Sequence, residues 1–115
     1  MITGIGVDIA SVSRFEGKER RFYERFLGPE ELRDEITAEY AASRFAAKEA
    51  FSKALGTGVR GFSMKEVAVV EDGLGKPSFS LSGKALERAG GRCFQLSLSH
   101  DGGFAVAFVV AEHEE

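Results

Sequence analysis

The segment over residues 38–55 constrains the fold most, because alanine dominates one of its faces. Thr37 is a good N-cap and Gly56 is the glycine that commonly follows a helix end, so we predict one helix between them. At about 100° per residue, one arc of that helix carries Ala46, Ala47, Ala50, Phe51, Ala54 and Leu55. Side chains this small let a helix press closely against a sheet.

The opposite arc of the same helix is polar and carries Arg44, Lys48, Glu49, Ser52 and Lys53. Such a face is most often only solvated. Glu49 and Lys53 stand at i,i+4, where an ordinary ion pair is worth about 0.2–0.5 kcal/mol. A functional interpretation of this face therefore needs support from other parts of the chain.

Strand-like runs lie on both sides of the helix in the sequence. They cover residues 2–10, 65–71, 78–82, 93–99 and 104–111, with a glycine-rich hairpin at 72–77. The order of elements lacks βαβ alternation, so we predict a single α+β domain over residues 1–115, with a small antiparallel sheet packed against the long helix. The last strand is apolar on both faces; helices of the chain can cover one face and a neighbouring subunit the other.

Three shorter helices are also expected. The apolar stripe of Val12, Phe15, Phe22 and Phe26 predicts a helix capped by Ser11 or Ser13. Pro29 suits the first turn of a second helix, and residues 84–89 form a third.

Charge is unevenly distributed along the chain. The net charge is −3, yet residues 14–25 hold five cations (Arg14, Lys18, Arg20, Arg21, Arg25) and three acids (Glu16, Glu19, Glu24). A basic segment on an acidic body suggests an acidic partner rather than a nucleic acid.

The composition excludes several classes of protein. Cys93 is the only cysteine, which excludes an internal disulfide and a cysteine-rich zinc site, and we interpret it as a small buried thiol. No run approaches the ~18 apolar residues of a membrane span. The first residues do not resemble a signal peptide, so we expect a cytoplasmic protein that does not bind membranes.

Three isolated residues are candidates for chemistry: Asp8 in an apolar strand, Glu49 on the long helix and His100 at a strand end. A buried carboxylate is costly unless it is paired or metal-bound, so Asp8 either caps the next helix or binds a metal. Two carboxylates without cysteine favour Mg²⁺. His100 alone is more often structural, and the glycine-rich loop at 56–61 is either a phosphate cradle or a plain turn.

Several short blocks, in this order and spacing, resemble the holo-[acyl-carrier-protein] synthases, the short AcpS-type 4'-phosphopantetheinyl transferases. The blocks are Gly6-Val7-Asp8-Ile9, Arg14-Phe15, Arg44-Phe45-Ala46-Ala47-Lys48-Glu49-Ala50 with Lys53, Gly56-Thr57-Gly58, Gly75-Lys76-Pro77 and Ser97-Leu98-Ser99-His100. The resemblance extends over nearly the whole chain.

The resemblance implies transfer of 4'-phosphopantetheine from coenzyme A to a serine of an apo acyl carrier protein, with release of 3',5'-ADP, in fatty acid biosynthesis. It implies that Asp8 and Glu49 bind Mg²⁺ against the coenzyme A pyrophosphate. Glu49, or a water that it orients, would be the base for the carrier serine. Lys53 would stabilise the departing phosphate, and His100 would donate to a phosphate or shuttle a proton.

The resemblance further implies that Arg44, Lys48, Ser52, Gly56, Pro77 and His100 surround coenzyme A. Arg14 and Arg21 would dock the acidic carrier, which is either a free protein or a domain of a large synthase. The fold would be that of a 4'-phosphopantetheinyl transferase, assembled as a homotrimer with active sites between subunits. Two alternatives use the same residues: a Mg²⁺-dependent phosphohydrolase of small nucleotides, and a non-catalytic oligomer that binds coenzyme A.

Overall fold

The computed structural model describes residues 1–56 and 61–113. Its elements are β1 (Ile2–Ser11), η1 (Val12–Phe15), α1 (Arg20–Tyr23), α2 (Ala38–Leu55), η2 (Met64–Glu66), β2 (Val67–Glu71), β3 (Pro77–Leu81), α3 (Gly83–Ala89), β4 (Cys93–Asp101) and β5 (Phe104–Glu112), where η1 and η2 are 3₁₀ turns. The predicted α+β class is confirmed, and so are the five predicted strands, although the second begins at Val67 because Met64–Glu66 form a turn.

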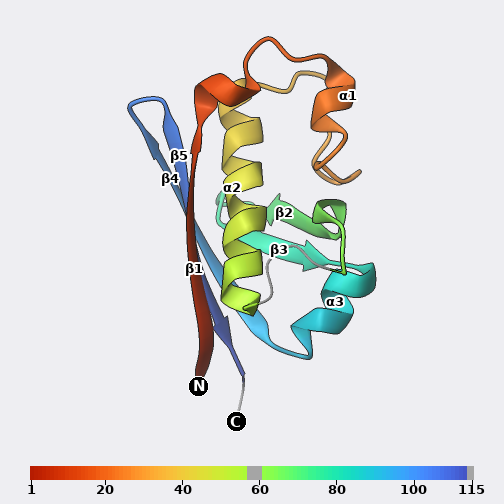
Figure 1. Cartoon of the computed structure of the whole chain (residues 1–115), viewed down its shortest axis with the longest axis vertical. Coiled ribbons are helices and arrows are strands. Elements are labelled where there is room, and N and C mark those ends of the chain that lie inside the picture. The colour runs from red at the N-terminus through yellow and green to blue at the C-terminus, as the bar shows by residue number, and fades with distance from the viewer. Residues whose placement is uncertain (57–60, 114–115) are drawn as a thin grey trace.

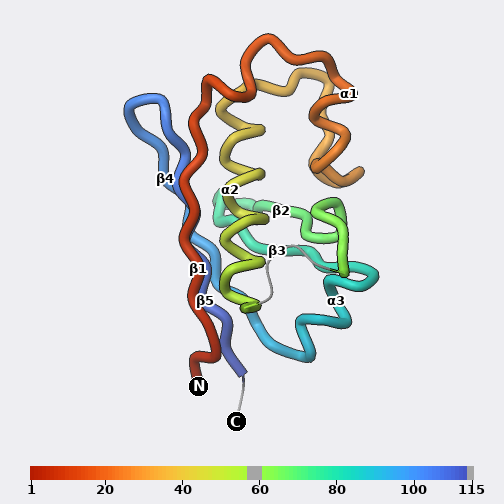
Figure 2. The backbone as a smooth tube through the Cα atoms, viewed as in Figure 1, coloured from red at the N-terminus to blue at the C-terminus, as the bar shows by residue number. Residues whose placement is uncertain are grey.

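Helix α2 lies between two antiparallel sheets (Figure 1). On one side is a three-stranded sheet in the order β1-β5-β4, and on the other is the hairpin of β2 and β3. The beginning of β1 and the end of β5 lie side by side (Figure 2), where the Met1 amino group donates a 2.9 Å hydrogen bond to the His113 carbonyl. The long helix is therefore covered on both sides.

The predicted bounds of α2 are confirmed at both ends. Thr37 Oγ1 accepts a 3.1 Å hydrogen bond from the Tyr40 amide, and Gly56 ends the helix at φ 90°. The alanine arc is buried as expected, with Ala46, Ala47 and Ala50 fully covered. Local capping chemistry is sufficient to set this helix.

Strand β1 packs against α2 backbone to backbone. A Cβ added to Gly6 would overlap the carbonyl oxygen of Ala50, and one added to Gly4 would overlap that of Ala54. Only glycine permits an approach this close. The side chain that follows on the same face of β1 is Asp8, so this contact brings Asp8 directly to α2.

The prediction of one continuous helix after Ser11 is wrong. Ser11 makes no side-chain cap, and Gly17 at φ 66° separates the turn η1 from the four-residue helix α1. The phenylalanine stripe nevertheless packs together, with ring centroids 5.4–6.1 Å apart among Phe15, Phe22, Phe26 and Phe45. The helix expected at Pro29 is also absent from the described residues, and a single turn from Gly28 to Glu31 takes its place.

The polar arc of α2 is largely not solvated, which corrects the interpretation of that face. Arg44, Lys48 and Ser52 are 6%, 1% and 1% exposed, because the β2–β3 side of the molecule covers them. Cys93, expected to be buried, is exposed.

On the side away from α2, strands β1 and β5 of the three-stranded sheet present an open apolar surface, while β4 contributes Gln95, Ser97 and Ser99 there. The apolar surface includes Ile5, Val7 and Ile9 of β1 and Phe104 and Phe108 of β5, which are 44–62% exposed. The opposite face of β5, formed by Ala105, Ala107, Val109 and Ala111, is fully buried. Over residues 1–56 and 61–113, none of the helices is both long and apolar enough to span a membrane.

Candidate active site

A cluster of charged side chains lies between β1 and one flank of α2. Lys53 Nζ donates a 3.0 Å hydrogen bond to Asp8 Oδ1 and a 2.9 Å bond to the Val7 carbonyl. Glu49 precedes Lys53 by one helical turn and is partly exposed on α2. The Asp8 and Lys53 side chains are 19% and 53% exposed, so solutes can reach the cluster. Because Asp8 pairs with Lys53, its alternative role as a helix cap is wrong.

The electrostatics of this cluster favour a cation. Burial raises the pKa of Glu49 above its usual value and the Asp8 carboxylate raises it further, while Lys53 and Arg14 lower it. Two carboxylates that repel each other in this way gain from a shared positive ion. The described residues contain no group of three or more His, Cys, Asp or Glu side chains suited to a metal. A pair of carboxylates suits Mg²⁺ that takes its other ligands from water and phosphate.

The two residues expected to bind a carrier differ in setting. The Arg14 guanidinium lies 5.4 and 5.2 Å from the ring centroids of Phe15 and Phe45, and it is close enough to influence Glu49. Arg21 is on α1, with its side chain 83% exposed and 3.7 Å from Glu19. Arg14 therefore borders the acidic cluster, whereas Arg21 belongs to the open surface.

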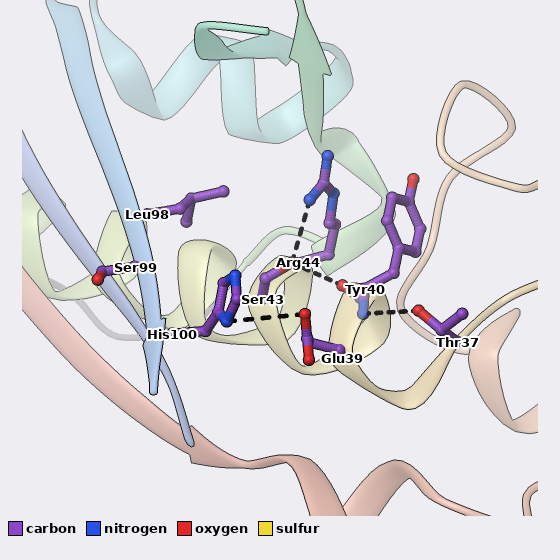
Figure 3. A pocket seen from close by; sticks show the side chains of 8 residues that line it. All are labelled: Thr37, Glu39, Tyr40, Ser43, Arg44, Leu98, Ser99 and His100. Atoms are coloured by element: carbon purple, nitrogen blue, oxygen red, sulfur yellow. Dashed lines mark hydrogen bonds and ion pairs between the residues drawn. The ribbon is translucent and has the colours of Figure 1, made fainter. Parts of the chain in front are cut away.

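A second set of site residues lines a pocket of about 280 Å³ between α2 and β4 (Figure 3). His100 extends from β4 toward α2, with Nδ1 3.7 Å from Glu39 Oε1. Tyr40, Ser43 and Arg44 line the α2 side of this pocket. Arg44 donates to the Glu71 carboxylate on β2 and, at 3.0 Å, to Ser43 Oγ.

Lys48 and Ser52 do not lie in either cluster. The Lys48 ammonium donates three hydrogen bonds inside the protein, to Glu31 Oε1 at 2.7 Å and to the Val67 and Met64 carbonyls at 2.7 and 2.9 Å. Its three donors are thereby used. Ser52 Oγ donates at 3.0 Å to the Lys48 carbonyl. Both side chains are buried and hydrogen-bonded inside the protein in this structure, and their assignment to the surroundings of coenzyme A stays a prediction.

The glycine and proline assigned to coenzyme A lie at element ends. Gly56 terminates α2, and Pro77 opens β3 opposite Glu71. Residues 57–60 of the loop considered as a phosphate cradle lie outside the described residues, so neither interpretation of that loop is tested.

Sequence analysis missed Glu31, Tyr40 and Glu71. Glu31 is buried and accepts hydrogen bonds from Lys48, Gly28 and Val69. Glu71 is the carboxylate partner of Arg44. Tyr40 lies beneath the Arg44 guanidinium, 4.2 Å from ring centroid to Cζ. Tyr40 stands at i,i+4 to Arg44 on α2, a spacing at which helix side chains meet, so that contact could have been predicted. The contacts of Glu31 with Lys48 and of Glu71 with Arg44 join segments 17 and 27 residues apart, and their spacing carries no such signal.

The two clusters occupy different flanks of α2. Asp8 pairs across the sheet with Ala107 of β5, which pairs in turn with Leu98 of β4, and His100 lies two residues beyond Leu98. Strand β5 thus separates the Asp8 side of the sheet from the His100 side. Within one chain, the structure brings together Asp8, Glu49 and Lys53, and it brings together Arg44 and His100, but it does not join the two groups.

The chain is similar to known proteins over nearly its full length. The model of a family described as the 4'-phosphopantetheinyl transferase superfamily matches residues 4–109. A holo-[acyl-carrier-protein] synthase of Geobacter sp. (strain M21) is 49% identical, with 97% of this chain and 99% of that protein covered.

Solved structures are also similar to this chain over nearly its full length. The crystal structure of holo-[acyl-carrier-protein] synthase from Neisseria meningitidis has a TM-score of 0.87 at 42% identity, covering 98% of this chain and all of that one. A holo-(acyl-carrier-protein) synthase from Bacillus anthracis in complex with CoA (3',5'-ADP) has a TM-score of 0.83 at 40% identity, with 99% of both chains covered.

Proposed function

The chain belongs to the 4'-phosphopantetheinyl transferase superfamily, and on that premise we propose that it transfers 4'-phosphopantetheine from coenzyme A to a serine of an apo acyl carrier protein. The reaction forms a phosphodiester on the serine oxygen and releases 3',5'-ADP. Residues 1–115 act as one transferase domain in fatty acid biosynthesis in the cytoplasm. The observation that carries the proposal is the cluster of Asp8, Glu49 and Lys53 between β1 and α2.

Glu49 is suited to accept the proton of the carrier serine. Its carboxylate is partly exposed on α2, one turn before Lys53, and a carboxylate can accept that proton directly or through a water that it orients. Lys53, one turn later, is half exposed and can donate to the phosphate oxygen on which negative charge develops. Phosphoryl-type transfer needs mainly positioning and charge stabilisation of this kind.

Asp8 and Glu49 fit a magnesium ion, because the carboxylates of β1 and α2 supply the oxygen ligands that it prefers and lie close enough for Asp8 to raise the pKa of Glu49. Mg²⁺ bound there would neutralise the pyrophosphate oxygens of coenzyme A. Asp8 then has two partners, since Lys53 also donates to it and fixes its carboxylate.

The second cluster is suited to the rest of coenzyme A. Arg44 and His100 border the pocket in Figure 3 and provide donors to phosphate oxygens. Pro77 at the start of β3 and Gly56 at the end of α2 do not line this pocket, and their contact with coenzyme A remains a prediction. We do not assign Lys48 or Ser52 a direct contact, because their polar atoms are engaged inside the protein.

The exposed apolar surface of β1 and β5 and the separation of the two clusters support assembly of the chain into a homotrimer. Ile5, Val7 and Ile9 of β1 and Phe104 and Phe108 of β5 form an open surface of the kind that marks a protein interface. Assembly through that surface would bring the acidic cluster of one subunit to the Arg44 and His100 pocket of another. One coenzyme A molecule would then contact both.

The basic segment near the acidic cluster is suited to dock an acidic carrier. Arg14 borders Glu49, and Arg21 extends the positive surface along α1. Charge attraction of this type weakens as salt is added.

Mass spectrometry tests the function directly. Purified protein, coenzyme A, Mg²⁺ and excess apo carrier should yield a carrier heavier by one phosphopantetheine, with 3',5'-ADP released in equal amount. The Glu49→Ala variant should lose that mass shift and remain a trimer by light scattering.

The two alternatives give different products. A phosphohydrolase would release cleaved nucleotide with the carrier unmodified, and a binding protein would leave both substrates intact. Transfer by Glu49→Ala at the wild-type rate would remove Glu49 from the mechanism.

A further inference from the structure

Arg44 is held tightly, with its hydrogen-bonding capacity only partly used. Its side chain is 8% exposed, one terminal nitrogen donates to Glu71 Oε1, and the other donates to Ser43 Oγ. Its Nε is buried and has no hydrogen-bond partner within the described part of the chain. An unsatisfied buried N–H costs free energy, so an arrangement in which the Nε of Arg44 also donates a hydrogen bond would be lower in free energy.

Arg44 shares the Tyr40 ring with a second guanidinium group. The Tyr40 ring centroid is 4.2 Å from the Arg44 guanidinium carbon and 3.8 Å from that of Arg33. The Tyr40 hydroxyl donates a 2.7 Å hydrogen bond to the Glu31 carbonyl, which fixes the ring. Glu71 is the carboxylate that is bonded to Arg44.

Arg44 also borders two cavities. It lines the pocket of about 280 Å³ with His100, and a second cavity of about 330 Å³ with Glu71, Arg33 and Glu30. A rotation of its side chain away from Glu71 would therefore bring its donors into the pocket that contains His100.

We propose that Glu71 is an internal counter-ion of Arg44 that competes with a phosphate group of coenzyme A and whose return to Arg44 promotes the release of 3',5'-ADP. The proposal rests on the function proposed above. A phosphate offers several acceptor oxygens and can engage Nε together with a terminal nitrogen, whereas Glu71 engages one terminal nitrogen only. Phosphate binding thus gives the Nε of Arg44 a hydrogen-bond partner. A phosphate must bind Arg44 more strongly than the Glu71 carboxylate does in order to displace it.

The backbone around Glu71 is fixed, so its carboxylate can bond to Arg44 again after a phosphate leaves. Glu71 ends β2 opposite Pro77, and the hairpin beyond it is fixed by Asp72 Oδ1, which accepts hydrogen bonds from the Leu74 and Lys76 amides at 2.8 and 2.9 Å. The Glu71 side chain is 41% exposed, so it can stay solvated while Arg44 is engaged elsewhere.

Calorimetry with 3',5'-ADP tests the proposal on the intact protein. Glu71→Gln should bind 3',5'-ADP about tenfold more tightly than wild type, the lower end for a hydrogen bond between charged groups, because Glu71 is partly exposed. Stopped-flow release of 3',5'-ADP should slow by a similar factor. In the transfer assay, the KM for coenzyme A should fall and kcat should fall with product release.

Glu30→Gln is the matched control, because Glu30 lines the same 330 Å³ cavity but makes no hydrogen bond to Arg44 among the described residues. It should change the affinity less than twofold. An unchanged or weaker affinity in Glu71→Gln, or equal tightening in both variants, would overturn the proposal while carrier modification by wild type continued. Absence of carrier modification by wild type would instead overturn the proposed function.

Discussion

Two lysines five residues apart on α2 are each paired with a carboxylate, yet their settings differ. Lys53 meets Asp8 with its side chain 53% exposed, and Lys48 meets Glu31 with both side chains fully buried. Burial lowers the pKa of the Lys48 ammonium and Glu31 raises it again. Five residues of an α-helix rotate the side chain by about 140°, which places Lys53 beside β1 and Lys48 beneath β2.

The two lysines differ in how much of their hydrogen-bonding capacity the protein itself uses. Lys48 uses all three donors on fixed acceptors and ties α2, the Gly28–Glu31 turn and β2 together. Lys53 uses two acceptors and remains open to solutes. The presence of an ion pair alone therefore does not indicate function. The number of donors that remain free on the lysine and the exposure of its side chain to solvent are more informative.

The largest effect should come from breaking the buried pair. Lys48→Met leaves the Glu31 carboxylate without its cation, which typically costs about 3–5 kcal/mol of unfolding free energy. Urea unfolding at fixed protein concentration measures the loss. The double variant with Glu31→Gln should recover part of it, because the uncompensated charge is gone. A loss below about 1 kcal/mol in Lys48→Met would show that the two pairs are equivalent for stability.

Breaking the exposed pair should affect activity rather than stability. Lys53→Met should lower kcat for carrier modification by about 10²–10³-fold, as expected when one donor to a developing charge is removed. Its unfolding free energy should change by less than about 1 kcal/mol, as for other exposed pairs. Parallel urea unfolding and transfer assays measure both. If Lys53→Met lost unfolding free energy and transfer activity in equal proportion, the distinction between the Lys53 pair and the Lys48 pair would be contradicted.

The smallest effect concerns the titration of Glu49 in the metal-free protein. Asp8 raises the pKa of Glu49, so Asp8→Asn should move that pKa downward toward the usual value for glutamate. At a pH near the midpoint, Glu49 would then be more ionised in the variant than in wild type. NMR titration of the Glu49 carboxyl carbon measures the shift. An upward or absent shift would mean that the two carboxylates do not share one site.

Sequence patterns predicted the features that depend on neighbouring residues. Thr37 and Gly56 fix the ends of α2 through local hydrogen bonds, and the alternation of 93–99 identifies β4. The burial of Lys48 could not be predicted in this way, because it requires the hairpin of β2 and β3 to return onto α2 after some twenty residues. The break at Gly17 was missed because the phenylalanine spacing also fits one helix.

For the same reason, only part of the candidate site was predicted from the sequence. Asp8, Glu49 and Lys53 were identified by residue type and by family resemblance, and the structure places them together. Glu71 contributes through a contact with Arg44 that joins β2 to α2, and composition and periodicity contain no record of it. Tyr40 lies one helical turn before Arg44, so its contact could have been recognised from that spacing.

The contact of Gly4 and Gly6 with the α2 backbone has an evolutionary consequence. No side chain separates the two elements there, so the spacing between the acids of β1 and α2 cannot be tuned by small changes in side-chain volume. Even one added methyl group would push the strand outward. We therefore expect substitutions in related chains to accumulate on exposed surfaces, while the distance between β1 and α2 at the Asp8 and Glu49 cluster stays fixed.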